Sequence, residues 1–400
     1  MEVIGIIFLI FITLLVLVAL DFQLGRQYFV KHQRDRTFSR RMSDLTLITD
    51  GESLYEELFQ SIQKSTHSIH ILFFIVRNDD ISNTFYTLLK EKAKEGVEVR
   101  LLLDFVGSFR LKRKTKAELK RSGVQVEFSR RPTFPFFFYS LQSRNHRKLA
   151  IIDGKEGYFG GFNIGKEYIG RNPNLGFWRD YHLKCEGEGV LDLQAQFLDD
   201  WFESTGEDLR NMKRYFPPLP KGRIEHHFVP TYGNRLEQHF LSFIEQAKEE
   251  LYICSPYFIP SKAIMKALIQ SLERGVQMTI MVPIKSDHPF VKEASLPYFA
   301  PLLQRGAAIY QYDYGFYHAK VIIVDEHVCD IGTANFDQRS LYLNDEINCF
   351  IYDRSFIQLV KEAVTHDLQK AKLLTTKQLT DMRTNARFRV QLATLLAPLL

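Results

Sequence analysis

The chain begins with a continuous run of apolar residues, Val3 to Leu20, in which no position is charged. A helix of this length spans about 27 Å, close to the thickness of a bilayer core. Glu2 precedes the run, and the first basic residues follow it: Arg26, Lys31, Arg34, Arg36, Arg40 and Arg41. A secretory leader has the opposite charge order, and the positive-inside rule places the rest of the chain in the cytoplasm. We therefore predict a single-pass cell-membrane anchor over 1–22 and a basic juxtamembrane segment over 23–42, with a buried core helix as the alternative.

Beyond this run, helical spacing alternates with short apolar strands, and the same order occurs twice. The stretch 54–76 combines an amphipathic helix with a continuous apolar run, and 236–259 has the same plan. A second helix, a glycine (Gly96 or Gly275) and a strand then follow in each copy, as expected where a helix ends in a left-handed residue. Such strands, apolar on both faces, are typical of parallel-rich sheets covered by helices. We expect an α/β fold of two pseudo-symmetric lobes with mixed, mainly parallel sheets.

A segment without periodicity, rich in proline and charge, separates the two copies at 212–227. We place the first lobe at 43–210, a linker at 211–225 and the second lobe at 226–372. The remaining residues, 373–400, form a basic amphipathic segment. That segment either packs on the body or lies on the membrane surface, and packing is the interpretation that we favour.

The composition is that of a globular protein, and it narrows the chemistry only slightly. Hydrophobic residues make up 45% of the chain, and the net charge of +5 suits work near anionic surfaces, although a solvated face explains it as well. The four cysteines are scattered without a C-x-x-C pair, which argues against a zinc site or a disulfide scaffold and for a reducing compartment. No carboxylate cluster suggests a metal site, and we predict no cofactor.

A polar pattern also occurs twice, at matching places in the two copies. In the first copy its members are His146, Lys148, Asp153, Gly160 and Asn163, and in the second they are His318, Lys320, Asp325, Gly332 and Asn335. The histidine and lysine are two residues apart on a strand, so both side chains leave the same face. The aspartate marks the end of the strand. The small residues Gly160, Gly161, Gly332 and Thr333 belong to the next turn, where backbone can approach a ligand closely.

These residue types suit the chemistry of a phosphodiester. Imidazole acts as nucleophile, acid or base near neutral pH, and lysine and asparagine can bind phosphate oxygens. Two such sets facing each other would place one histidine on each side of a phosphorus atom, so that one attacks and the other protonates the leaving alkoxide. Asp180 and Glu346, downstream of each copy, are candidates to orient a histidine through its second nitrogen.

Two less specific interpretations compete with this one. A histidine on a strand is more often a core or surface residue than a catalytic one, and a repeated motif can persist as an inert copy. Five matched positions in each of two copies, at equivalent places in a repeated plan, make a catalytic role the better interpretation.

The duplicated pattern H-x-K-x₄-D-x₆-G-x-x-N resembles the phospholipase D superfamily, whose members share a duplicated α/β/α sandwich and a phosphohistidine intermediate. Flanking segments on both sides of each copy resemble bacterial cardiolipin synthases: 101–108, 145–170, 178–187, 197–201, 286–320 and 332–348. Longer members of that family usually have two membrane spans, so the single predicted span resembles a shorter, minor type. Gly161 stands where the superfamily often has serine.

The resemblance implies a phosphatidyl transfer between two phosphatidylglycerol molecules that yields cardiolipin and glycerol. It implies catalytic roles for His146, Lys148, Asp153, His318, Lys320 and Asp325. It implies substrate binding by Asn163, Asn335, Gly160, Gly161, Gly332 and Thr333. We favour His146 as the nucleophile and His318 as the general acid and base, and the reverse assignment stays open. The expected partners are phosphatidylglycerol and other anionic lipids of the bilayer, without nucleic acid, and the oligomeric state stays open.

Two other functions fit the same signature. A phospholipase D-type hydrolase or a nuclease would use water as the acceptor, and a non-catalytic scaffold would only bind anionic lipids.

Two segments bear on membrane contact. The aromatic stretch 130–140 could enter the headgroup region or fold onto the core, and the basic stretch 110–121 could face anionic lipid or only solvent.

Overall fold

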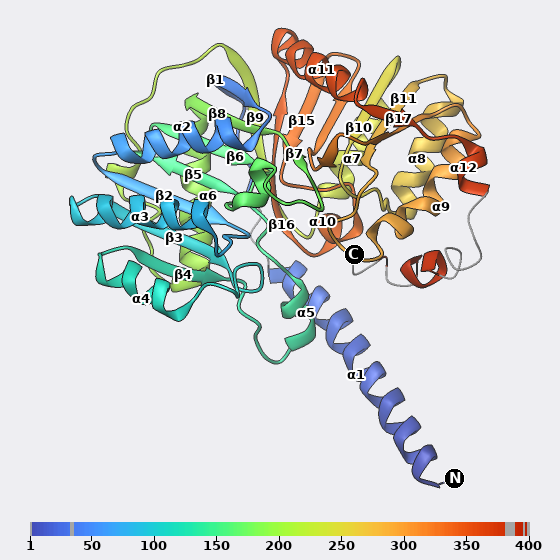
Figure 1. Ribbon diagram of the computed structural model, residues 1–400, viewed down its shortest axis with the longest axis horizontal. Helices are drawn as coiled ribbons and strands as arrows, with labels where there is room; N and C mark the ends of the chain where they lie inside the picture. The colour runs from blue at the N-terminus through green and yellow to red at the C-terminus, as the bar shows by residue number, and fades with distance from the viewer. Residues whose placement is uncertain (1, 33–35, 381–388, 395–396, 398–400) are drawn as a thin grey trace.

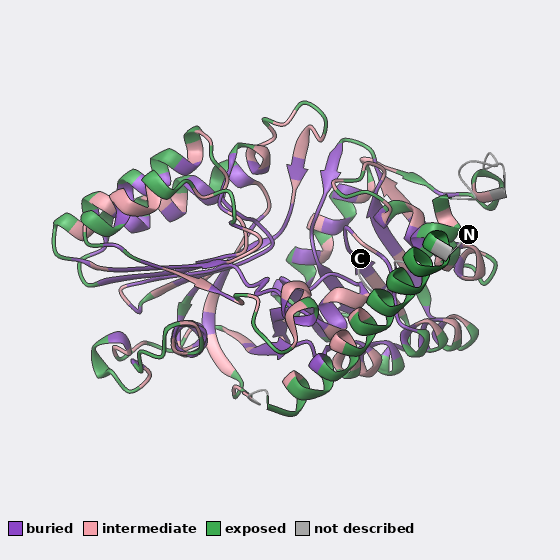
Figure 2. Cartoon of the chain, turned by 90° about the horizontal axis from the view of Figure 1, so that it is seen from below, coloured by how far each residue is buried: buried purple, intermediate pink, exposed green. Residues whose placement is uncertain are grey.

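The computed structural model describes residues 2–32, 36–380, 389–394 and 397, and its first element is one long helix. Helix α1 (Glu2–His32) projects from the body and is exposed along most of its length (Figures 1 and 2). None of its apolar window is buried, and it is long and apolar enough to cross a membrane. The helix continues well past the predicted anchor, so that juxtamembrane residues up to His32 are also helical.

One mixed sheet of fifteen strands runs through the described part of the body, and its order repeats on either side of its centre. Outward from the centre, the first half contributes β1 (Arg41–Ile48), β8 (His182–Gly187), β6 (Glu156–Gly160), β5 (Leu149–Ile152), β2 (Ser68–Phe73), β3 (Glu98–Asp104) and β4 (Gln125–Ser129). The second half contributes β9 (Ile224–Tyr232), β16 (Asp345–Ile351), β15 (Val328–Gly332), β14 (Val321–Val324), β10 (Glu250–Cys254), β11 (Gln277–Pro283), β12 (Ala308–Tyr312) and β17 (Ala371–Leu373). The antiparallel pair β1–β9 joins the halves, which confirms the predicted duplication.

The expectation of mainly parallel sheets is wrong. Among the described strands of the large sheet, only β2–β3–β4 and β10–β11–β12 are joined in parallel, and every other neighbouring pair is antiparallel. The strands that follow each histidine form hairpins, β5–β6 and β14–β15. Because helices cover both faces of the sheet, these antiparallel strands are as apolar as parallel ones, and their sequences do not distinguish the two cases.

Helices cover both faces of the sheet in each half. The helices of the first half are α2 (Gly51–Lys64), α3 (Asp80–Lys94), α4 (Arg113–Arg121), α5 (Phe137–Gln142) and α6 (Gly189–Thr205), of which α5 packs on α1. Those of the second half are α7 (Leu236–Gln246), α8 (Lys262–Glu273), α9 (Val291–Leu303), α10 (Gln338–Tyr342), α11 (Arg354–Leu368) and α12 (Thr376–Thr380), of which α10 packs on α7 and α12 on α9. Helices α2 and α3 pack on one face of the first half and α7 and α8 on the equivalent face of the second, while α6 and α11 share a core on the other face.

Local signals account for several of these boundaries. The side chains of Asp50, Asp79 and Ser261 accept hydrogen bonds from backbone amides in the first turns of α2, α3 and α8, and thereby satisfy donors that the helices leave unpaired. Gly96 and Gly275 both have a φ of +93°, which confirms the left-handed positions predicted after the second helix of each copy.

Two smaller regions complete the fold. A parallel two-stranded sheet, β7 (Phe177–Arg179) with β13 (Gly315–Tyr317), links the halves near the motif histidines. Near the C-terminus, Ala393 is buried in a cluster with Val291 of α9, so the described part of this segment packs on the body. The residues 381–388 of that segment lie outside the described residues.

Candidate active site

The two motif histidines, which are far apart in the sequence, line one cavity of about 720 Å³ between the lobes. Each histidine lies just before the first strand of its hairpin. The backbone amide of His146 donates to the carbonyl of Asp345 in the other half, over 2.9 Å. The amide of His318 donates to the carbonyl of Arg179, over 2.7 Å. Each half therefore fixes the position of the histidine that the other half contributes.

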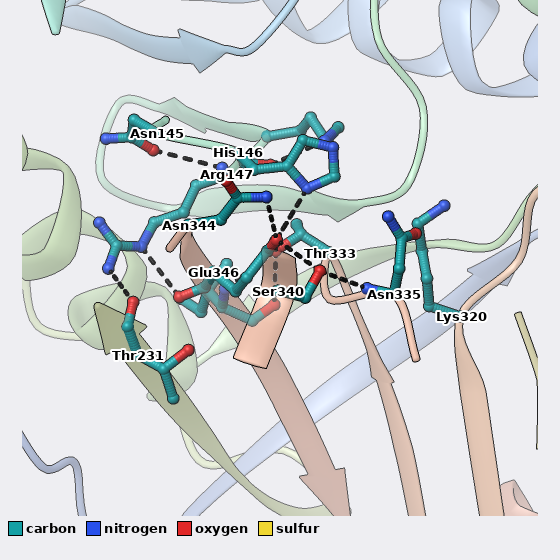
Figure 3. A network of polar contacts seen from close by, with 12 residues as sticks. Asn145, His146, Arg147, Thr231, Lys320, Thr333, Asn335, Ser340, Asn344 and Glu346 are labelled. Carbon is teal, nitrogen blue, oxygen red and sulfur yellow. Dashed lines mark hydrogen bonds and ion pairs between the residues drawn. The ribbon is translucent and has the colours of Figure 1, made fainter. Parts of the chain in front are cut away.

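The carboxylates that orient the histidines are also exchanged between the halves. Glu346, from the second half, lies 3.0 Å from Nδ1 of His146 (Figure 3). Asp180, from the first half, is hydrogen-bonded to Nδ1 of His318. Because a carboxylate only accepts, Nδ1 of His146 carries the proton and its Nε2 is the nitrogen available for chemistry. Asp180 favours the same tautomer of His318, but Nζ of Lys320 also lies 2.7 Å from that Nδ1, so the ring, the carboxylate and the lysine form one coupled proton network.

Glu346 is held by three further side chains of its own half. The Thr333 hydroxyl donates to it over 2.6 Å, the Ser340 hydroxyl over 3.1 Å and the Asn344 amide over 3.3 Å (Figure 3). Burial opposes ionisation of Glu346, but His146 and Lys148 more than offset this, and the pKa of the carboxyl is lowered. Glu346 is therefore an ionised, fully fixed acceptor.

Asp180 has a different environment. It receives a hydrogen bond from the Tyr181 amide over 2.8 Å, and Nζ of Lys320 lies 3.8 Å away. Burial opposes its ionisation, but Lys320 and His318 lower its pKa. A side chain at Gly161 would place a Cβ 2.0 Å from Oδ1 of Asp180, so the carboxylate needs the space that only glycine leaves.

The two motif lysines lie beneath the histidines. Nζ of Lys148 donates to the carbonyl of His146 over 2.7 Å, and Lys320 makes the equivalent bond to the carbonyl of His318. Burial lowers the pKa of Lys148 to about 7 and that of Lys320 to about 8. The two ammonium groups thus titrate close to neutral pH, and an anion bound beside them would favour the charged form.

The imidazoles are neutral at this pH. Burial lowers the pKa of His146 to about 4, although Glu346 acts in the opposite direction. Burial, with Lys320, also lowers the pKa of His318. An unprotonated Nε2 is what nucleophilic attack requires, and the ring that acts as the acid must gain its proton when substrate binds.

The motif asparagines line the same cavity. Oδ1 of Asn163 accepts a hydrogen bond from the amide of Ile75 over 3.0 Å, which leaves its amide nitrogen to donate. Within the described structure, the buried Oδ1 of Asn335 has no hydrogen-bond partner. Only the Nδ2 groups of the two side chains can donate to the oxygens of an anion in the cavity, whereas the unpaired Oδ1 of Asn335 can accept a hydrogen bond from a ligand hydroxyl.

The predicted small residues lie behind the cavity wall. A Cβ at Gly160 would lie 2.6 Å from the Cα of His182, and a Cβ at Gly332 would lie 2.6 Å from the side chain of Asn348. Gly161 leaves room for Asp180, and the hydroxyl of Thr333 donates to Glu346. All four positions therefore shape the cavity from behind its wall. None of the four is among the residues that line the cavity, and their direct contact with a substrate stays a prediction.

Asp153 and Asp325 are not among the residues that line the cavity, and backbone amides engage their carboxylates, so their placement favours a structural role over the predicted catalytic one. Each follows its strand at the end opposite to the histidine, and each has a positive φ, +54° and +46°. Asp153 accepts hydrogen bonds from the amides of Thr66, His67 and Ser68. Asp325 accepts from three amides at 248–250 in the same way. Both aspartates fix the loop before the neighbouring strand, and the sequence pattern alone did not separate this role from catalysis.

Several cavity residues were not identified from the sequence. Aromatic rings lie beside each histidine, with Phe74 4.9 Å from His146 and Trp178 4.9 Å from His318. Other polar residues also line the cavity, among them Arg144, Tyr257, Asp287, Asp337, Arg339 and Asn344. Position next to the motif segments was the available signal for all of these polar residues except Tyr257 and Asp287. Within the described part of the chain, no group of three or more His, Cys, Asp or Glu residues could hold a metal ion.

Comparison with known proteins finds one family in both halves. The family model described as "Cardiolipin synthase, PLD-like domain" matches residues 58–201 and 240–368. The minor cardiolipin synthase ClsB of Bacillus subtilis (strain 168) is 44% identical over 375 residues, or 94% of each chain. Cardiolipin synthase 2 of Staphylococcus epidermidis is 36% identical over 95% of this chain and 81% of the relative. A crystal structure of phosphatidylserine synthase from Haemophilus influenzae Rd KW20 shares the fold, with a TM-score of 0.72 at 14% identity, over 90% of this chain and 97% of that one.

Proposed function

The chain belongs to the cardiolipin synthase family with phospholipase D-like domains, and from this premise we propose that it transfers a phosphatidyl group between two phosphatidylglycerol molecules. The products are cardiolipin and glycerol. One observation carries the proposal: two neutral histidines line one cavity, and each is oriented by a carboxylate of the opposite half.

In the first step, Nε2 of His146 attacks the phosphorus of one phosphatidylglycerol. A nitrogen–phosphorus bond forms and the bond to the headgroup glycerol oxygen breaks. That oxygen takes the proton that Nε2 of His318 has gained from solvent on substrate binding, and it leaves as glycerol, so that His318 is neutral when the second step begins. Glu346 accepts from Nδ1–H of His146 throughout and stabilises the positive charge that develops on the ring.

In the second step, the headgroup hydroxyl of another phosphatidylglycerol gives its proton to His318 and attacks the same phosphorus. The nitrogen–phosphorus bond breaks, and cardiolipin leaves with His146 restored. Asn163 and Asn335, which line the cavity, donate to the non-bridging oxygens in both steps. Lys148 and Lys320, which are bound to the carbonyls of the two histidines, stabilise the charge on these oxygens from behind the cavity wall. The fixed environment of Glu346 favours His146 as the nucleophile, because a fully positioned acceptor keeps the Nε2 lone pair directed into the cavity.

The location of the reaction follows from the anchor. Helix α1 would hold the body against the bilayer, and the basic residues after Leu20 favour the cytoplasmic side. Helix α5, within the aromatic stretch, packs against α1 through Tyr139, whose amide donates to Asp21 over 2.9 Å. Phe134 remains 85% exposed beside this contact, which supports entry of the aromatic stretch into the headgroup region.

The test is an assay of the purified full-length protein in vesicles of labelled phosphatidylglycerol, with lipids separated after incubation. The proposal expects cardiolipin and glycerol in equal amounts. Phosphatidic acid without cardiolipin would instead indicate the hydrolase, and unchanged lipid would exclude both reactions. Acid-labile, base-stable label retained on the His146 peptide would identify the nucleophile, and label on the His318 peptide would reverse the assignment.

A further inference from the structure

A second cavity, of about 800 Å³, lies between the last third of α1 and the second lobe. One wall is formed by α1, with Phe22, Arg26, Val30 and Lys31 among its lining residues. The opposite wall is formed by the start of α7 and the end of α10, where Tyr342 lies. We call this cavity the α1 groove. None of the residues to which the proposed reaction assigns a role lines it.

The membrane-facing end of the α1 groove lies at the depth of lipid headgroups if α1 crosses the bilayer. The apolar run ends at Leu20, and at about 1.5 Å per residue the lining residues of α1 lie roughly 3 to 16 Å beyond it. The headgroup region extends about 5–8 Å beyond the hydrocarbon core on each side. The groove therefore begins at the lipid surface, and its α1 wall is continuous with the membrane span (Figure 1).

The lining of the groove suits an anionic lipid. It contains three cations, Arg26, Lys31 and Arg235, and one carboxylate, Glu237. One oxygen of this carboxylate accepts a hydrogen bond from the Tyr342 hydroxyl over 2.6 Å, so that oxygen already has a partner in the wall of the groove. Apolar lining comes from Phe22, Val30, Leu341 and the Tyr342 ring, and the guanidinium of Arg26 lies over that ring at 4.6 Å. Cations beside apolar surface match a phosphate that is attached to acyl chains.

We propose that the α1 groove binds a phospholipid with an anionic headgroup from the same leaflet, at a site separate from the catalytic cavity. Its phosphate lies against Arg26, the long Lys31 side chain adds positive charge on the water side of the phosphate, and its chains extend along α1 into the bilayer. This inference goes beyond the proposed reaction, because binding in the groove requires no chemistry.

Helix α10 places this lipid next to the reaction. Its residues Leu341 and Tyr342 line the groove, whereas Arg339, from the same helix, lines the catalytic cavity. The guanidinium of Arg339 also donates to the carbonyl of Gln142 at the end of α5, over 2.8 Å, and α5 packs on α1. A bound lipid would thus contact the helix that separates the two cavities, and would hold α1 and the second lobe together.

The test uses the full chain with His146→Ala, which keeps lipid binding separate from turnover. Native mass spectrometry of the protein in detergent micelles would count bound phosphatidylglycerol, with phosphatidylcholine as the neutral probe and glycerol phosphate as the probe without chains. We expect phosphatidylglycerol to bind in preference to both. Adding Arg26→Gln and Lys31→Gln should weaken this binding about 30-fold, because each cation near a lipid surface contributes about fivefold.

Two controls make the outcome decisive. Lys213→Gln with Lys221→Gln removes the same charge from exposed positions in the linker, and should leave binding unchanged. Val30→Trp fills the groove without altering charge, and should weaken binding as well. Equal binding by the Arg26 and Lys31 variant, or equal binding of phosphatidylcholine, would overturn the site. Because all variants contain His146→Ala, failure to form cardiolipin in the wild-type chain would refute the reaction without affecting this result.

Discussion

The two half-sites contain the same residue types but hold them in different ways. His146 faces Glu346, a carboxylate that three further polar side chains of the second half fix in place. His318 faces Asp180, which none of the equivalent side chains supports and which instead has the ammonium of Lys320 at 3.8 Å. The repeat is therefore symmetric in its backbone and in its motif, but the two histidines differ in the side chains that hold their orienting carboxylates.

The asymmetry can be traced to one position after the motif glycine. In the second half Thr333 occupies it, and its hydroxyl donates to Glu346. In the first half Gly161 occupies it, and the carboxylate of Asp180 fills the space where a side chain would be. The longer carboxylate, Glu346, is paired with a residue that donates a hydroxyl hydrogen bond, and the shorter one, Asp180, is paired with a glycine that leaves room for it. Both arrangements place a carboxylate next to Nδ1 of a histidine. The difference suggests that one histidine is fixed for attack, while the other shares a coupled proton network with a lysine.

Replacement of either histidine gives the largest expected effect. His146→Ala and His318→Ala should each lower cardiolipin formation by about 10⁴-fold or more. Both histidines act in the same steps, so the loss of either one removes most of the catalysis. The pair can be separated by trapping the labelled covalent adduct. His146→Ala should form none, whereas His318→Ala should still form some from a donor with a good leaving group. Adduct formation by His146→Ala alone would reverse the assignment.

Changes at Glu346, the carboxylate that orients His146, should have the second-largest effect on the reaction. Glu346→Gln should lower kcat about 10³-fold with little change in KM, because an amide can donate to Nδ1 and thereby stabilise the wrong tautomer. Thr333→Val keeps the carboxylate and removes one of its donors, so a loss of about tenfold is expected. Steady-state kinetics in mixed micelles would measure both. A larger effect of Thr333→Val than of Glu346→Gln would contradict the proposed role of the carboxylate.

The lysines are expected to have smaller effects than the histidines. Lys148→Ala or Lys320→Ala should lower kcat/KM about 100-fold, equivalent to about 3 kcal/mol of transition-state stabilisation. Lys155→Ala, at an exposed position in the adjoining turn, is the matched control and should be neutral. If the two motif lysines had no more effect than Lys155, charge stabilisation by the cavity floor would be excluded.

The pH dependence of kcat/KM should report the ionisation of the motif histidines and lysines. Below a pH of about 4 His146 becomes protonated and loses its nucleophilic lone pair, so kcat/KM falls on the acid side. On the basic side kcat/KM falls first where His318 loses the proton that it must donate, at a pKa that burial and Lys320 lower. It falls further as the buried Lys148 loses its proton above a pH of about 7 and Lys320 above about 8. Lys148→Arg should move the part of the fall that Lys148 causes to higher pH, and a profile without any further fall between pH 7 and 9 would show that these lysines remain charged.

The smallest effect on catalysis should come from the aspartates that the motif shares with the histidines. Asp153→Ala removes a carboxylate that binds three backbone amides, and should lower the free energy of unfolding by about 1–2 kcal/mol. The folded variant should keep near wild-type kcat, and Asp325→Ala should behave likewise. Thermal melts together with activity at a low temperature would measure the two effects separately. A large loss of kcat without a change in melting temperature would restore Asp153 to the catalytic group.

Much of the site could be predicted from the sequence, since the pattern is local. A histidine and a lysine two residues apart on a strand must share a face, and their recurrence at equivalent places predicted a common cavity. Asp153 shows the limit of the same reasoning: a strand of four residues separates it from the motif lysine, and nothing in the pattern says which end of that strand faces the cavity. Antiparallel pairing was missed for a similar reason, because burial on both faces makes the strands equally apolar.

The sequence by itself predicted the long apolar helix that could cross a membrane, the duplication and the residues able to bind a phosphodiester, because hydropathy and side-chain alternation act over a few neighbouring residues. Only the tertiary structure decided that the carboxylates are exchanged between the halves, since Glu346 is 200 residues from His146 and Asp180 is 138 residues from His318. Such pairings depend on how the two lobes join through β1 and β9. No local pattern encodes them, because packing across a shared sheet sets those distances.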